Sequence, residues 1–113
     1  MNNEISLPQG DRTNNYRILA PTGYPDISDP SWIGEYTIRE RNITGAIEQQ
    51  GFVGKDVNGG SFLFFLDADM SATLSVGTKF LTVEIRNMDI TPSFRREPIR
   101  SVLKITDSGV PNV

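Results

Sequence analysis

The side chains that most often carry out catalysis are missing from this chain. Its 113 residues include no histidine and no cysteine. Catalytic centres of the Ser-His-Asp or Cys-His type are therefore excluded, together with the usual zinc and copper ligand sets. Without cysteine, no disulfide can cross-link the fold. We expect a protein that has no enzymatic activity and needs no cofactor.

Asp67 and Asp69 form the one tight acidic pair that follows an apolar segment. Two carboxylates at this spacing could hold a calcium or magnesium ion if further oxygens converged on them. The residues after Asp67 do not match the calcium-loop pattern, because the later Asp or Asn and the invariant Gly are missing. We therefore favour a local role, in which Asp caps a short helix and ends the preceding strand.

Basic residues gather only once, as Arg95, Arg96 and Arg100, in a polar stretch between two predicted strands. This group could contact phosphate or an acidic partner surface, or could belong to a solvated hairpin loop. The net charge is -3 and the other cations are dispersed, so we expect no nucleic-acid partner. No apolar run approaches the roughly 18 residues that span a bilayer, so we expect no membrane partner either.

Aromatic residues give the second candidate site. The segment 61–66 is apolar at nearly every position and too short for a helix, so it predicts a strand that is covered on both faces or contacts a partner subunit. Trp32 and Tyr36 are expected in the core, with sugar stacking by Trp32, Tyr24 or Tyr36 as the alternative. The predicted partner interface consists of Phe62, Phe64, Phe65, Arg95, Arg96 and Arg100.

These groups must be positioned mainly by strands. Apolar residues recur at every second position in several segments that are separated by Gly, Pro, Asn and Asp, as in a chain of short strands. The region 87–100 reads as a long hairpin loop or an added edge element, and 67–74 as one or two helical turns. The predicted strands are 13–20, 31–41, 43–53 with a bulge or bend, 61–66, 80–86 and 102–106.

This spacing, with almost no helix, favours an all-β fold. We predict an immunoglobulin-like antiparallel β-sandwich of about six to eight strands, with at most one short helical turn. The length fits a single domain over residues 1–113. Residues 1–8 and 108–113 are the candidates for flexible arms that become ordered on a neighbouring chain.

Three short motifs give the chain a family resemblance. They are an opening Gln9-Gly10-Asp11, a turn at Asn42-Ile43-Thr44-Gly45, and Leu74-x-x-Gly77 followed by a strand with Phe80 near the expected aromatic. In this order they resemble the small N-terminal β-sandwich of phage baseplate upper proteins, although the second and third motifs are shifted or altered. The resemblance implies a non-enzymatic component of a tailed-phage virion that contacts other virion proteins and further copies of itself.

The expected function is therefore a structural one. The chain is predicted to act in a tailed-phage virion as a baseplate or tail adaptor, a head–tail connector-region protein or a capsid decoration protein. It would be made in the host cytoplasm and would form a homo-oligomer or join a ring or capsid. The alternatives are a carbohydrate-binding β-sandwich module and a small inhibitor of a host protein. Because one fold serves many roles, the fold cannot choose among them.

Overall fold

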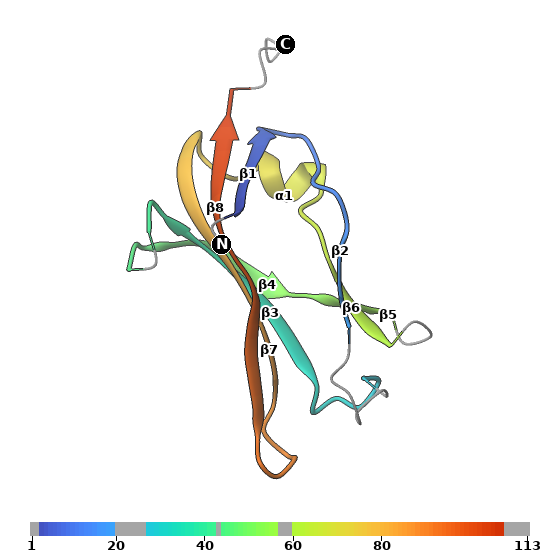
Figure 1. The fold of residues 1–113 in the computed structure, drawn as a ribbon. Helices are drawn as coiled ribbons and strands as arrows, with labels where there is room; N and C mark the ends of the chain where they lie inside the picture. Colours follow the sequence, from blue (N-terminus) through green and yellow to red (C-terminus); the bar gives the residue numbers. More distant parts are fainter. Residues whose placement is uncertain (1–2, 20–26, 43, 57–59, 108–113) are drawn as a thin grey trace.

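The computed structural model describes residues 3–19, 27–42, 44–56 and 60–107, which fold into two β layers and one short helix (Figure 1). The elements in chain order are β1 (Asn3–Pro8), β2 (Tyr16–Leu19), β3 (Ile33–Glu40), β4 (Ile47–Phe52), β5 (Gly54–Asp56), β6 (Ser61–Phe64), α1 (Ala68–Ala72), β7 (Gly77–Asn87) and β8 (Phe94–Thr106). The predicted all-β sandwich with a single short helix is confirmed.

The larger sheet has five strands in the order β1-β8-β7-β3-β4. Its centre is the long antiparallel hairpin of β7 and β8, and β3 runs antiparallel to β7. β1 runs parallel to β8, with Ile5 opposite Leu103. Two predictions therefore need correction: the sandwich is not antiparallel throughout, and residues 3–8 form a paired strand rather than an arm. The second predicted arm, 108–113, lies outside the described residues.

The smaller sheet has three antiparallel strands in the order β2-β6-β5, so β6 is its central strand. The chain passes from one sheet to the other between β4 and β5, through the single residue Val53. The Val53 amide donates a hydrogen bond of 2.8 Å to the carbonyl of Gly34 in β3, which holds the crossing point against the larger sheet. β4 and β5, the last strands of their respective sheets, thus meet at one corner.

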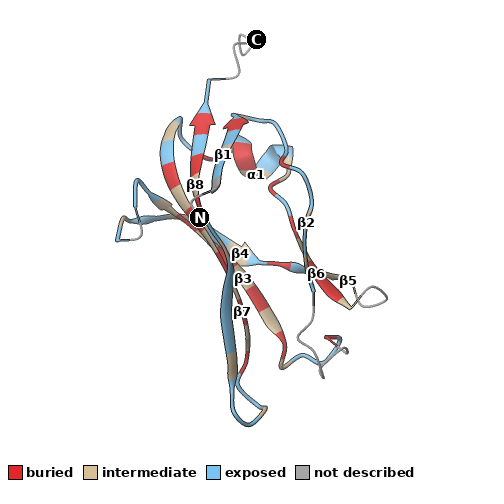
Figure 2. Cartoon of the chain, in the orientation of Figure 1, coloured by how far each residue is buried: buried red, intermediate tan, exposed pale blue. Residues whose placement is uncertain are grey.

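The core lies between the two sheets (Figure 2). β3 and β7 bury every second residue, as their alternating sequences predict. Tyr36 of β3 packs on Phe64 of β6, with ring centroids 5.5 Å apart. Gly34 permits the closest approach, because a Cβ at this position would lie 3.0 Å from both Phe62 Cδ1 and Val53 Cβ. The prediction that Trp32 and Tyr36 are core residues is confirmed, since both are buried.

The helix α1 closes one end of the sandwich. Asp67 is its N-cap and accepts a 2.7 Å hydrogen bond from the Met70 amide, which confirms the predicted capping role. The buried Ser71 hydroxyl donates to the carbonyl of Asp11 and thereby ties the helix to the loop after β1. Within the described ranges, no helix has the length and apolar character needed to cross a membrane.

The predicted strand boundaries require further corrections. β2 begins at Tyr16, later than expected, and Ala20 lies outside the described residues. β4 begins at Ile47 and does carry a bulge, because Gln49 pairs with Ile38 while Ile47 pairs with Arg39. The region 87–100 is largely strand: β7 runs to Asn87, and β8 already begins at Phe94.

Candidate functional site

The three phenylalanines of the predicted interface differ in how far they are buried. Phe62 is fully buried and Phe64 is 2% exposed, so both side chains belong to the core and cannot reach a partner. Their inclusion in the interface was wrong, because the second sheet presents β6 to the first sheet instead of to solvent. Phe65 follows β6 and is 38% exposed, with the Arg12 guanidinium 5.2 Å from its ring centroid. Only Phe65 remains accessible.

The predicted arginines all lie on β8 and are exposed. Arg95 Nε donates to Glu84 Oε2 at 2.9 Å, and the Arg96 guanidinium lies 6.0 Å from the Phe94 ring centroid. The Arg100 guanidinium lies 5.7 Å from the Phe80 ring centroid. The three side chains thus spread along one strand instead of forming a single cluster in a loop.

An ionic network crosses three strands on the outer face of the larger sheet. Arg86 of β7 pairs with Glu35 of β3 and with Glu84, which in turn pairs with Arg95 of β8. The hydrogen bond from Arg95 is the main cause that lowers the pKa of Glu84, assisted by Arg86 against the opposing effect of burial. The network joins neighbouring strands and leaves much of the Arg95 side chain exposed.

In the described part of the chain, no third acidic side chain joins the acidic pair, and the core aromatic residues are buried. No group of three or more acidic side chains that could hold a metal gathers in the described parts of the chain, around Asp67 and Asp69 or elsewhere. Trp32 is 3% and Tyr36 is 6% exposed, so neither ring can stack on a sugar. Trp32 instead packs edge-on against Phe94, with centroids 5.5 Å apart. Tyr24 lies outside the described residues.

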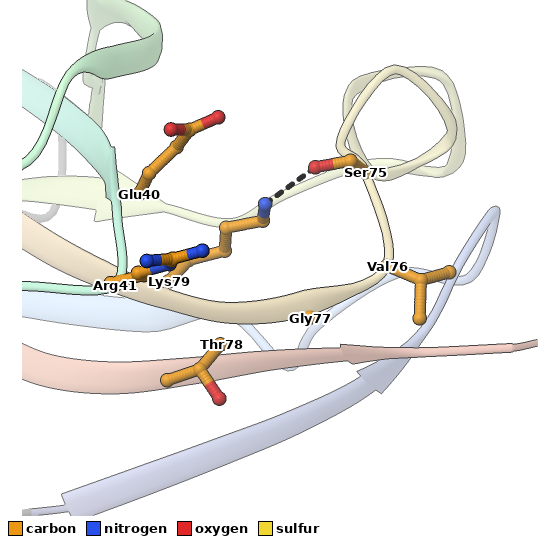
Figure 3. A pocket seen from close by; sticks show the side chains of 7 residues that line it. All are labelled: Glu40, Arg41, Ser75, Val76, Gly77, Thr78 and Lys79. Carbon is orange, nitrogen blue, oxygen red and sulfur yellow. Dashed lines mark hydrogen bonds between the residues drawn. The ribbon is translucent and has the colours of Figure 1, made fainter.

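A polar pocket of about 540 Å³ lies at the end of the sandwich near α1 (Figure 3). Lys79 reaches into this region although it is only 4% exposed, and its Nζ donates a 2.5 Å hydrogen bond to Ser75 Oγ. Lys79 Nζ also lies 2.6 Å from Glu48 Oε2. Ser75 donates to Glu48 Oε1 from its amide and its hydroxyl. The pocket is lined by Glu40, Arg41, Ser75, Val76, Gly77, Thr78 and Lys79.

The Ser75–Lys79 contact has the residue types of a serine nucleophile with a lysine base. Glu48 contacts both the serine and the lysine. Burial alone raises the pKa of Glu48, but the contacts with Lys79 and Ser75 outweigh burial and lower it overall. The carboxylate therefore stays charged, accepts hydrogen bonds from the Ser75 amide and hydroxyl, and forms an ion pair with Lys79. This cluster connects β4, β7 and the turn between α1 and β7.

An apolar corner remains accessible where β4 meets β5. We call Phe52, Val53 and Leu63 the β4–β5 corner. Phe52 is 79% exposed, the highest value among the large hydrophobic residues described as exposed. A hollow of about 280 Å³ on one side of Phe52 also reaches Leu63, and another of about 350 Å³ also reaches Trp32. Both hollows are also lined by Val53, which is only 7% exposed, and by Lys55, so the Phe52 ring supplies most of the accessible apolar surface of the corner.

Sequence reasoning missed this corner and the Glu48–Lys79 ion pair. The signal for Phe52 was weak because the β4 bulge breaks the alternation of apolar and polar residues. Glu48, Ser75 and Lys79 meet only through tertiary contacts between distant segments.

The comparisons with known proteins are negative. No protein-family model matches the chain, and no curated protein matches its sequence significantly.

Proposed function

We propose that this protein is a non-enzymatic structural component of a tailed-phage virion and that it acts through protein–protein contacts. The observation that carries the proposal is the β4–β5 corner. The Phe52 ring is highly exposed and lies between two hollows. Aromatic residues in such positions are enriched at the centres of protein–protein interfaces.

The topology supports the same surface. β4 and β5 are terminal strands of their sheets, and no strand in the described ranges pairs with their outer edges. Unpaired strand edges offer backbone hydrogen-bond donors and acceptors to another chain. The exposed Phe52 ring and the edge of β4 therefore lie together at the corner.

The virion assignment rests on the resemblance to the β-sandwich of phage baseplate upper proteins. The proposed partners are other virion proteins and further copies of this chain, in a baseplate or tail adaptor, the connector region or a capsid decoration. Arg95, Arg96 and Arg100 provide a second exposed surface on β8, which would suit an acidic partner.

Cosedimentation with tailed-phage particles that lack this protein tests the proposal. We expect saturable binding to those particles and none to complete particles, whose sites are already filled. A chain that binds neither kind of particle would contradict the proposal. In that case, binding to a glycan array would favour the carbohydrate-binding alternative, and stoichiometric binding to one purified host protein would favour the inhibitor.

A further inference from the structure

The bulge in β4 determines which side chains this edge strand presents outward. Ile47 and Phe52 are five positions apart, so a regular strand would place them on opposite faces. The extra residue, Glu48, shifts the alternation, and the two residues pair with Arg39 and Glu35 on the outer face of β3. Ile47 is 47% exposed and Phe52 is more exposed still. The outer face of β4 thus has one accessible apolar residue near each end.

The outer-face positions of this strand lie evenly on either side of Gln50. Counted by their partners in β3, the paired positions of β4 run Phe52, Gly51, Gln50, Gln49 and Ile47, with Gln50 in the middle. An antiparallel copy of the strand, related by a two-fold axis at Gln50, would place Phe52 opposite Ile47 of the second copy. Gln50 would lie opposite its own equivalent. Aromatic and β-branched residues make favourable cross-strand pairs.

The edge carries little that would prevent such pairing. Strand edges are commonly protected by charged residues such as Lys, by Pro and by bulges. β4 contains no Lys, Arg or Pro. Its only charged residue, Glu48, turns inward to Lys79. The proposed register requires that Glu48 stay out of the pairing at the outer edge, as it does against β3.

The charges beside the edge are complementary under the same two-fold axis. In each copy, acidic Glu35 flanks Phe52 and basic Arg39 flanks Ile47. Placing Phe52 opposite Ile47 of the second copy puts the acidic end of one β3 in the same row as the basic end of the other. Glu35 is already paired with Arg86 of its own subunit, and three strand spacings of about 4.8 Å separate the two β3 strands. Salt screening therefore leaves this complementarity only a weak preference for the antiparallel arrangement.

We propose that two copies of this chain associate through β4 as an antiparallel, two-fold symmetric strand pair that joins their larger sheets into one continuous sheet. The inference rests on the proposed function and specifies its self-contact: Phe52 of each copy covers Ile47 of the other. Two-fold contacts of this kind use one surface patch on both subunits and close the assembly at a dimer.

A single introduced cysteine tests the position of the axis, because the natural chain contains none. Directly opposed residues of antiparallel strands have Cα atoms about 4.5–5.5 Å apart, which is within the range for a disulfide. We expect Gln50→Cys to form a covalent dimer under mild oxidation. The matched control is Ser6→Cys, an exposed position on β1 at the opposite edge of the same sheet, which should stay monomeric on a non-reducing gel.

Sedimentation velocity of the untagged chain over a wide concentration range supplies the second readout. We expect a monomer–dimer equilibrium that Phe52→Lys shifts strongly toward monomer. Leu19→Lys changes a residue of similar exposure, 70%, on the other sheet and should leave the equilibrium unchanged. Equal cross-linking of the two cysteine variants, equal effects of the two lysine variants, or a monomer at every concentration would overturn the inference.

These outcomes are separable from those of the particle-binding test. A chain that is always monomeric but binds particles saturably overturns the β4 pairing and leaves the structural function standing. A β4-paired dimer that does not bind particles supports the β4 pairing and contradicts the structural function.

Discussion

The phenylalanines of β6 and β4 differ sharply in solvent exposure. β6 buries Phe62 and Phe64 between the sheets, whereas β4 leaves Phe52 exposed at the corner. β6 is the central strand of its sheet and faces the other layer, whereas β4 is an edge strand whose Phe52 lies on the outer face. The place of a strand in the topology, more than the apolar content of its sequence, decides whether an aromatic residue stabilises the fold or is free to contact a partner.

Truncating the two kinds of phenylalanine gives the sharpest contrast. Phe62→Ala leaves a cavity in the core and should reduce the free energy of unfolding by about 3–5 kcal/mol. Phe52→Ala should change it by less than about 0.5 kcal/mol, because an exposed ring loses little on truncation. Urea denaturation at a concentration where the chain is monomeric measures both values. Similar losses for the two variants would mean that Phe52 is also part of the core.

The ion pairs offer a second contrast between covered and open sites. Glu48→Ala leaves the Lys79 ammonium without its carboxylate at a site where the lysine side chain is 5% exposed. We expect a loss of about 3 kcal/mol in the free energy of unfolding, as for other broken buried pairs. Glu4→Ala removes the exposed partner of Lys104 and should cost less than about 1 kcal/mol. Thermal or urea unfolding of both variants checks this, and equal small losses would contradict the structural role of Glu48.

Gly34 and Gly54 compare a tight site with an open one. An alanine Cβ at Gly34 would lie 3.0 Å from Phe62 and Val53, whereas at Gly54 it would lie 3.5 Å from the Leu63 carbonyl oxygen. Overpacking the sheet interface with Gly34→Ala should cost about 1–3 kcal/mol of unfolding free energy. Gly54→Ala should leave stability nearly unchanged. Chemical denaturation of the two variants in parallel gives the difference.

Acid should weaken the fold through the same carboxylates. Folding lowers the pKa values of Glu48 and Glu84 below the ordinary value of 4.5. Their contribution is therefore fully present above about pH 4.5 and is lost as the pH falls through the folded-state values. Glu48→Gln should flatten this part of the stability–pH curve. An unchanged acid dependence in Glu48→Gln and in Glu84→Gln would contradict these assignments.

The sequence predicted the parts of the fold where local pattern and burial coincide. The alternation from Trp32 to Ile38 identified β3, and Asp67 identified the start of the helix. β1 was not predicted, because its six residues are held in a strand by parallel pairing with β8, near the other end of the chain. The start of β8 was obscured by Pro98, which lies where the β7–β8 register shifts and a proline is tolerated.

Amide hydrogen exchange of the free chain, at a concentration where it is monomeric, and of the particle-bound chain tests the central claim most directly, because it locates the contact without any mutation. The β4–β5 corner as the contact surface predicts that binding slows exchange chiefly in residues 47–56, whose outer edge groups become paired or covered. The segment 94–100, which carries the exposed arginines, should change less. Slowed exchange over 94–100 with none over 47–56 would show that the contact lies on β8 and would contradict the account.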